Sequence, residues 1–217
     1  MGKIIVIEGT DCSGKETQTM LLMQKLKTNG YKVDRISFPE YNSPTGRIIG
    51  GPYLGRNNDS YFEEETNKVD PKVASLYYAA DRRYHKDKIL ELVNNNDYLI
   101  IDRYVESNMA HQGGKLFDEK DRLKLYEDLY NLEYVFLELP KPDITIFLNM
   151  PYKKVLELKS GRLGTDGHES NPLHIRNSIN AYLELAKIHN YIIIDCVTKD
   201  NKLKDIEDIN NEIYKNI

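Results

Sequence analysis

Short apolar runs alternate with longer amphipathic segments along the chain, and this alternation limits the folds open to it. The apolar runs have the length and β-branched character of buried strands; they lie at residues 4–7, 32–38, 98–101, 144–148 and 191–194. Segments with helical period separate them, at residues 15–29, 71–94, 118–137, 152–159, 172–189 and 202–214. Continuous apolar strands joined by helices predict an α/β fold, with a five-stranded parallel sheet covered by helices on both faces.

Length and composition narrow the class of protein. A chain of 217 residues supports one well-buried core, so we expect a single domain over residues 1–217. The net charge is −4 and no stretch of Lys and Arg stands apart from balancing acids, which argues against binding to DNA or RNA. No apolar run is long enough to span a membrane, and no signal-peptide pattern opens the sequence. With Cys12 and Cys196 far apart, we expect free thiols and a cytoplasmic protein that is intact from its first residue.

A phosphate-binding loop follows the first apolar run. Gly9, Gly14 and Lys15 have the G-x-x-x-x-G-K spacing, between a predicted strand and a predicted helix. Its glycines let backbone N–H groups point inward, and the helix beginning at Lys15 adds its positive end. We therefore expect a P-loop fold in which Lys15 contacts the outer phosphates of a nucleotide. The predicted binding residues are Gly9, Thr10, Asp11, Cys12, Ser13, Gly14, Lys15, Glu16 and Thr17.

One residue departs from this motif, at the position where Ser or Thr normally ligates magnesium. Glu16 follows the lysine, and two interpretations remain open. Its carboxylate ligates the metal directly, or it lies in solvent and favours the helix N-terminus by its charge. Thr17 faces about 100° away on the helix and is a poor substitute.

Charged residues also follow the third apolar run. Arg103 is placed to bind a phosphate monoester through two parallel hydrogen bonds. Asp102 is a candidate to orient a second ligand that accepts a phosphoryl group, or a metal-bound water. Asp11, in the phosphate loop, is a candidate to organise the binding site of that acceptor. The alternative is a structural ion pair between Asp102 and Arg103.

Several segments together resemble the thymidylate kinase family of nucleoside-monophosphate kinases, over nearly the whole chain. The segments are Glu8–Gln18, Phe38–Tyr41, Leu76–Arg82, Asp102–Asn108 and Leu139–Asp143. The resemblance implies transfer of the γ-phosphoryl group of ATP to dTMP, with Mg²⁺, by a homodimer. In this family an arginine at the position of Arg103 binds the acceptor phosphate.

The resemblance also assigns a thymine pocket and the groups around the acceptor. Tyr78 and Arg82 lie four residues apart on one helix face, where a ring stacks on the base and a guanidinium reaches its edge. Without the resemblance, the sequence predicts that Tyr78 is a core residue and Arg82 a solvated charge.

Further residues match substrate positions of the family. Asn108 matches a base-edge position, and His111 stands where some members have a tyrosine near the sugar. Phe38 and Tyr41 are expected at the substrate, the hydroxyl of Tyr41 at the acceptor phosphate, with Arg47 as another source of positive charge.

A polar segment at about residues 160–171 resembles the mobile lid of the family. Family members carry an arginine in the phosphate loop or rely on lid arginines. Because Cys12 and Ser13 occupy that part of the loop, Arg162 is the candidate cation for the transition state, and a solvated loop arginine is the alternative.

The predicted catalytic residues are thus Asp11, Lys15, Arg103 and Arg162, with Asp102 and Glu16 as metal candidates. A kinase for another deoxynucleoside monophosphate, or for a deoxynucleoside with Glu8 or Asp102 as base, remains an alternative. A catalytically weak nucleotide-binding protein is the other, because of Glu16.

Overall fold

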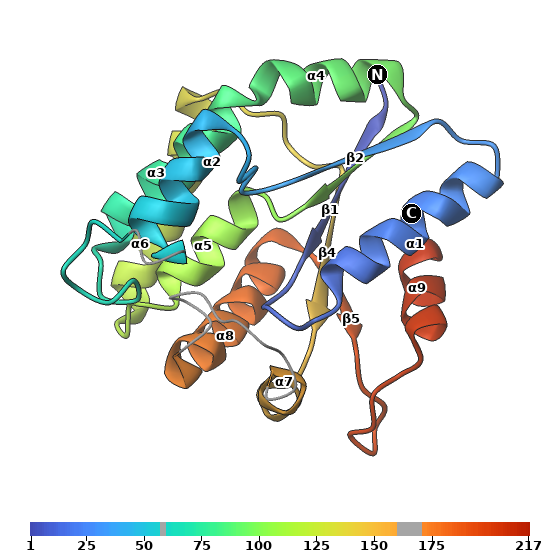
Figure 1. Cartoon of the computed structure of the whole chain (residues 1–217). Helices are drawn as coiled ribbons and strands as arrows, with labels where there is room; N and C mark the ends of the chain where they lie inside the picture. The colour runs from blue at the N-terminus through green and yellow to red at the C-terminus, as the bar shows by residue number, and fades with distance from the viewer. Residues whose placement is uncertain (57–59, 160–170) are drawn as a thin grey trace.

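The computed structural model describes residues 1–56, 60–159 and 171–217, and these build a parallel sheet with helices on both faces (Figure 1). The strands run in the order β2-β3-β1-β4-β5, every pair parallel. Their bounds are Lys3–Glu8 (β1), Val33–Ser37 (β2), Tyr98–Asp102 (β3), Ile144–Asn149 (β4) and Ile192–Asp195 (β5). The predicted fold class and all five strand positions are confirmed.

Helices are joined to the strands by loops. The α-helices are Lys15–Thr28 (α1), Pro44–Ile48 (α2), Pro71–Tyr84 (α3), Lys86–Asn95 (α4), Val105–Gly113 (α5), Glu119–Tyr130 (α6), Tyr152–Lys159 (α7), Pro172–His189 (α8) and Ile206–Tyr214 (α9). Two π-helical turns cover Ile49–Tyr53 (η1) and Asn131–Phe136 (η3). No helix in the described ranges is long and apolar enough to cross a membrane.

Side chains of β1 alternate between two apolar layers, because successive residues of a strand face opposite sides. Ile5 and Ile7 pack in the layer that includes residues of α1 and α9, whereas Ile4 and Val6 pack in the layer that includes residues of α4, α5, α6 and α8. All four β1 residues are at most 3% exposed. Burial on both faces explains why β1 reads as a continuous apolar run rather than an alternating one.

Three predicted helix bounds were wrong. The predicted helix at 71–94 is two helices, because His85 closes α3: its amide donates to the carbonyl of Asp81 at 3.3 Å, and its Nδ1 lies 2.8 Å from the same oxygen. The helix predicted at 118–137 ends at Tyr130 and continues as η3. The last helix begins at Ile206 rather than 202, because residues 198–202 form a turn, with Thr198 N–H donating to the Lys202 carbonyl at 2.8 Å.

Helix α5 was not predicted at all. It follows Asp102 and Arg103, and every residue except His111 is buried. Its polar residues are buried together with its apolar ones, so polarity does not separate an inner from an outer face and the sequence shows no amphipathic period. Helices α3, α6 and α8 contact it, and this short helix positions much of the site described next.

Candidate active site

The loop between β1 and α1 has the backbone of an anion site at the carboxyl edge of the sheet. Gly14 adopts φ 84° at the N-cap of α1, a left-handed conformation that favours glycine, and Cys12 adopts φ 62°. Gly9 has no room for a side chain, since an added Cβ would lie 2.6 Å from the Ser13 Oγ. The free N–H groups at the start of α1 and the helix dipole together favour a bound phosphate.

Lys15 lies over this loop as a buried cation. Its Nζ donates to the Thr10 carbonyl at 2.8 Å, and the residue is 7% exposed. Burial and the nearby Arg103 guanidinium lower the Lys15 pKa to about 8, although Asp11, Asp102 and Glu8 counteract part of the shift. An arriving phosphate would therefore stabilise the charged form of Lys15.

Two of the predicted metal candidates lie in different surroundings. Glu16 is exposed in the first turn of α1, and its side chain forms no hydrogen bond with the described part of the chain. Asp102 ends β3 beside Ile7 and is 9% exposed. Its Oδ1 has no hydrogen-bond partner among the described residues, so this carboxylate oxygen is available to a metal-bound water or a metal.

Arg103 pairs with Asp11 rather than with its neighbour Asp102. The Arg103 Nη2 donates to the Asp11 carboxylate, and Nη1 donates to the Gly9 carbonyl at 3.3 Å. The alternative of an ion pair between Asp102 and Arg103 is therefore wrong, because the partner of Arg103 is Asp11. Arg103 links the phosphate loop to the end of β3, and its side chain remains 19% exposed.

His111 lies on the other side of Arg103. Arg103 Nη1 is 3.3 Å from His111 Nε2, and because a guanidinium only donates, Nε2 must be the acceptor. Burial, then the Arg103 charge, lowers the pKa of His111 well below its ordinary value. His111 Nδ1 therefore carries the proton, 3.4 Å from both His174 Nε2 and Ser178 Oγ.

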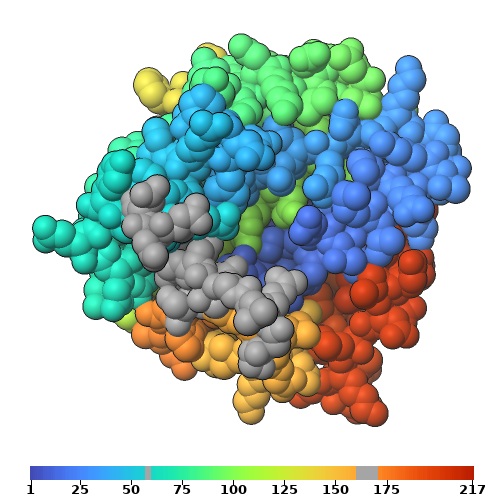
Figure 2. Space-filling view, in the orientation of Figure 1, coloured from blue at the N-terminus to red at the C-terminus, as the bar shows by residue number. Residues whose placement is uncertain are grey.

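A cavity opens beside Arg103, between the segment after β2, α3 and α5, and we call it the acceptor cavity. Figure 2 shows this face hollowed between the α2 segment and the phosphate loop. Its walls include many predicted residues: Asp11, Phe38, Tyr41, Tyr78, Arg82, Arg103, Asn108 and His111. Other lining residues were not predicted: Pro39, Leu54, Arg56, Ser107 and Gln112.

Arg82 is part of a buried polar cluster as well as of the cavity wall. Its Nη2 donates to Glu133 Oε1 at 2.7 Å and its Nε to Oε2, with Arg82 2% and Glu133 0% exposed. The Asn108 amide nitrogen donates to the same Oε1 at 2.9 Å and to the Ser75 carbonyl at 3.1 Å. The solvated-charge alternative for Arg82 is therefore wrong, because Glu133 holds it inside the protein.

Unpaired amide groups face this region from α5. Asn108 Oδ1 and both amide atoms of Gln112 are buried without a hydrogen-bond partner within the described ranges. Buried polar groups are normally hydrogen-bonded, so a polar ligand edge is a suitable partner. The sequence carried one signal for Gln112: it lies four residues after Asn108, on one face of a helix that we did not predict.

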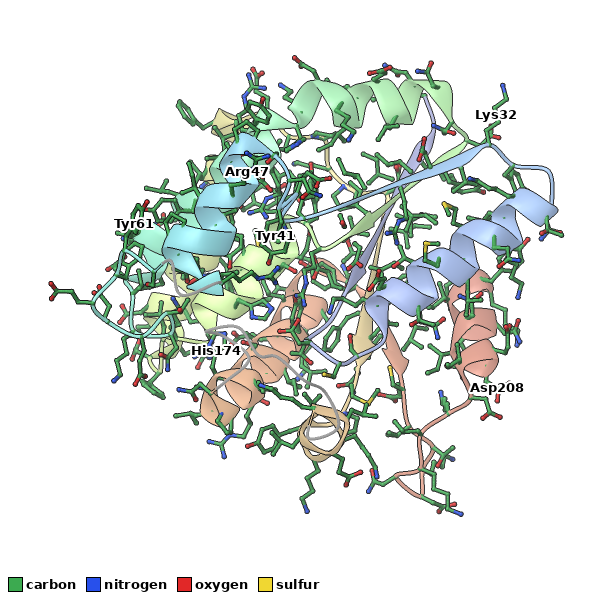
Figure 3. The ribbon with its side chains drawn as sticks, viewed as in Figure 1. Lys32, Tyr41, Arg47, Tyr61, His174 and Asp208 are labelled. Carbon is green, nitrogen blue, oxygen red and sulfur yellow. The ribbon has the colours of Figure 1, made fainter. Side chains whose placement is uncertain are left out.

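The cation near Tyr41 is Arg56 rather than Arg47. The Arg56 guanidinium lies 3.8 Å from the centroid of the Tyr41 ring, and both residues line the cavity. Arg47 is exposed on α2, as Figure 3 shows. Tyr78 is half-buried and packs edge-on against Tyr53 with a centroid distance of 5.8 Å.

Glu8, considered as a base, is bound on all sides. Its carboxylate accepts from the amides of Tyr104 at 2.8 Å and Ser107 at 3.2 Å, and from the hydroxyls of Ser107 at 2.6 Å and Tyr182 at 2.8 Å. These donors are structural, so Glu8 holds α5 in place. The predicted lid, with Arg162, lies outside the described residues except for Asn171, which caps α8.

Comparisons with known proteins agree on one family. The family model of thymidylate kinase matches residues 7–206. Similar relatives include the thymidylate kinases of Prochlorococcus marinus (strain AS9601), 28% identical over 100% of this chain and 95% of the relative, and of Plasmodium falciparum, 28% identical over 100% and 90%. A probable thymidylate kinase of Caldivirga maquilingensis is 30% identical over 87% and 83%. A solved structure of thymidylate kinase from Candida albicans matches with a TM-score of 0.74 and 26% identity, over 100% of this chain and 91% of that one.

The buried pair of Arg82 and Glu133 yields a stability prediction. Glu133→Ala leaves Arg82 as an uncompensated buried charge, and we expect a loss of about 3–5 kcal/mol in the free energy of unfolding. Urea denaturation measures it. The double variant Arg82→Met/Glu133→Leu removes both charges and should recover most of the loss.

The matched control is Glu138→Ala, which removes a carboxylate that is 71% exposed and pairs with Lys86 at 2.9 Å. This change should cost less than about 1 kcal/mol. Equal losses from Glu133→Ala and Glu138→Ala would contradict the buried pair.

Proposed function

This chain belongs to the thymidylate kinase family, and we propose that it transfers the γ-phosphoryl group of ATP to dTMP, giving dTDP for dTTP synthesis. As a family member it is an ATP-dependent phosphotransferase. The observation that carries the proposal is the position of Arg103. It contacts Gly9 and Asp11 of the phosphate loop and also lines the acceptor cavity. Arg103 therefore adjoins both the proposed site of the phosphoryl donor and the proposed site of the acceptor.

On the donor side, we assign the ATP phosphates to the loop amides and Lys15. Residues 9–17 supply the N–H groups, and Lys15 supplies a charge next to the outer phosphates. Phosphoryl transfer requires positioning and neutralisation of charge rather than covalent help from the protein. Lys15 and Arg103 provide that charge at the phosphate loop, and both lie near Asp11.

One observation indicates that the described residues can hold Mg²⁺. Asp102 offers a buried carboxylate oxygen without a protein partner in the described ranges, and Mg²⁺ prefers oxygen ligands, with one or two carboxylates and substrate phosphates. Among the described residues, no three or more His, Cys, Asp or Glu side chains lie together as a metal site. This arrangement suits a metal held mainly by the nucleotide and water. Asp102 would hold it, with Glu16 as the second candidate. When bound, the ion neutralises phosphate charge.

On the acceptor side, we assign the phosphate of dTMP to Arg103, Tyr41 and Arg56. The base would stack on Tyr78, with the amides of Asn108 and Gln112 at its edge. Arg82 lines the same wall and its orientation is fixed by Glu133. His111, beside Arg103, is then close to the sugar, and Phe38 closes the cavity near the β2 end. Arg162 remains the proposed lid cation.

No general base is required for this reaction. A phosphate monoester is already an anion and attacks with its own oxygen, whereas a nucleoside must lose a hydroxyl proton. Glu8, one of the two bases considered for a nucleoside kinase, is occupied by four structural hydrogen bonds. Arg56 and Arg103 on the cavity wall suit an acceptor that carries a phosphate.

We also propose a cytoplasmic homodimer. Neither Cys12 nor Cys196 forms a disulfide among the described residues, as expected for a reducing compartment. On α3, Val73 (41% exposed), Leu76 (57%) and Tyr84 (59%) lie along one stripe, and η3, which contacts α3, adds Val135 (60%) and Phe136 (78%). A contiguous exposed apolar surface of this kind is typical of an interface between proteins.

A substrate panel tests the function. With ATP and MgCl₂, turnover should be fastest with dTMP among dTMP, dUMP, dCMP, dAMP, dGMP and thymidine. Gln112→Leu should raise the KM for dTMP about tenfold, because it removes polar partners worth about 1–2 kcal/mol. The same change at exposed Gln24 of α1 is the control. Faster turnover of thymidine than of dTMP would refute the proposal.

The lowered pKa of Lys15 predicts a pH effect on ATP binding. Free Lys15 loses its proton as the pH rises through about 8, while bound phosphate keeps it charged, so binding takes up a proton above that pH. We expect ATP affinity to fall about tenfold between pH 7.5 and 9.5, measured by calorimetry. In Lys15→Arg the charge persists, and the slope should disappear; a slope that survives this change would assign it elsewhere.

The interface proposal has its own measurement. Leu76→Glu places a charge in the centre of the stripe and should convert a dimer to a monomer in sedimentation velocity, since a buried unpaired charge is costly. Leu123→Glu, on α6 and 39% exposed, is the matched control and should stay dimeric. A wild type that sediments as a monomer at micromolar concentration contradicts the proposal.

A further inference from the structure

A second cavity lies on the other side of α5 from the acceptor cavity. Ser107, Asn108 and Gln112 of α5 line the acceptor cavity, whereas Glu106 and Met109 line the second one. The remaining walls come from the ends of α6 and η3, the start of β4 and the connection from α8 to β5. The second cavity has a volume of about 320 Å³, which is in the range of pockets that hold small ligands.

The cavity wall contains a buried carboxylate with a free oxygen. Glu106 is 4% exposed, and its Oε1 accepts from the Tyr134 hydroxyl at 2.6 Å. Its Oε2 has no hydrogen-bond partner in the described part of the chain. Burial and the neighbouring Glu8 carboxylate raise the pKa of Glu106 to about 7. A positively charged donor in the cavity would stabilise this carboxylate.

Aromatic rings form much of the rest of the wall. Tyr130 and Tyr134 have a centroid distance of 5.2 Å, and His189 lies parallel to Tyr130 at 6.1 Å and to Tyr191 at 5.9 Å. Faces of aromatic rings attract cations, most strongly where water is excluded. The wall thus combines ring faces with one buried carboxyl group that has an unpaired oxygen.

The chain already places one ammonium group against these rings. Lys141 Nζ lies 4.7 Å from the Tyr130 centroid and 5.9 Å from the Tyr134 centroid, and it donates to the Tyr130 hydroxyl. Lys141 is exposed at the rim, and Asp143 beside it accepts from the Ile4 amide at 2.7 Å through Oδ2. Lys141 marks the position that a cation takes here, without a hydrogen bond to Glu106.

We propose that this second cavity binds a small aliphatic ammonium ion, with its charged group directed toward Glu106 and its alkyl chain against the rings of Tyr130 and Tyr134. The chemistry required is a compact primary ammonium, because Lys141 shows that geometry against the same rings. The ligand competes with the Lys141 side chain for the aromatic wall. The site uses none of the residues assigned to ATP or dTMP, so it does not rest on the proposed function.

Calorimetry with n-butylammonium chloride tests the site on the full-length protein. We expect saturable binding of one ion per chain, about tenfold tighter to Lys141→Ala than to the wild type, because the competing internal cation is gone. Lys153→Ala removes an equivalent charge from the exposed face of α7 and should leave the affinity at the wild-type value. 1-Butanol, which has the same shape without the charge, should show no saturable binding.

Two further variants locate the ion within the cavity. In the Lys141→Ala background, Glu106→Gln should weaken binding at least about tenfold, because the carboxylate partner becomes neutral. Tyr130→Leu, which leaves the buried charge in place, should weaken it about fivefold, so the test survives if Glu106→Gln does not fold. Circular dichroism melting checks each variant.

Saturating dTMP should leave n-butylammonium bound, since the two ligands occupy opposite sides of α5. Displacement by dTMP would overturn the proposal, and so would absence of binding to Lys141→Ala up to about 20 mM. Binding to the Glu106→Gln and Tyr130→Leu variants that is as tight as to the Lys141→Ala background would also overturn it. A protein that binds the ammonium ion but does not phosphorylate dTMP would refute the proposed function alone.

Discussion

The carboxylate of Glu8 holds together the elements on which the candidate site depends. It ends β1 at full burial and accepts hydrogen bonds from the start of α5 and from Tyr182 of α8. Burial raises its pKa, which shows that its surroundings disfavour an isolated charge. The four donors offset that cost only while α5 and α8 stay in place, so the buried acid specifies one position for α5. Because α5 separates the two cavities, both inherit their geometry from this one group.

Opposite charges gather where the phosphate loop meets the acceptor cavity. Arg103 lowers the pKa of Lys15, Asp11 and Asp102 raise it, and Asp11 forms an ion pair with Arg103. Asp11 fixes the Arg103 fork before any phosphate arrives, and the neutral imidazole of His111 supports the other side. The Thr10 carbonyl likewise holds the Lys15 ammonium, so both cations are oriented before a phosphate binds.

Local patterns were sufficient for the sheet and the phosphate loop, and they failed where distant residues meet. Apolar runs located every strand because burial on both faces leaves a continuous signal. The partners of Arg82 and Arg103, Glu133 and Asp11, are 51 and 92 positions away, and no spacing rule connects them. Helix α5 left no periodic signal because it is buried nearly all round, so Gln112 was missed with it. Arg56 follows η1, outside the residue ranges given above for the predicted strands and helices.

If the base binds as proposed, the polar lining of the acceptor cavity restricts which base is selected. Asn108 offers an acceptor oxygen, and Gln112 offers an amide nitrogen and an amide oxygen, all buried and without a partner among the described residues. Thymine and uracil present the same edge, an N–H between two carbonyl groups, so these amides cannot separate the two. Discrimination between them must come from the apolar wall, where Phe38, Leu54 and Tyr78 lie, and one methyl group there is worth about 1 kcal/mol. The Asn108 amide nitrogen donates to Glu133 and to the Ser75 carbonyl, which fixes Oδ1 as an acceptor, so a base bound as proposed must present a donor to it. The Gln112 amide can exchange its donor and acceptor by rotation, so it adapts to the edge that the base presents.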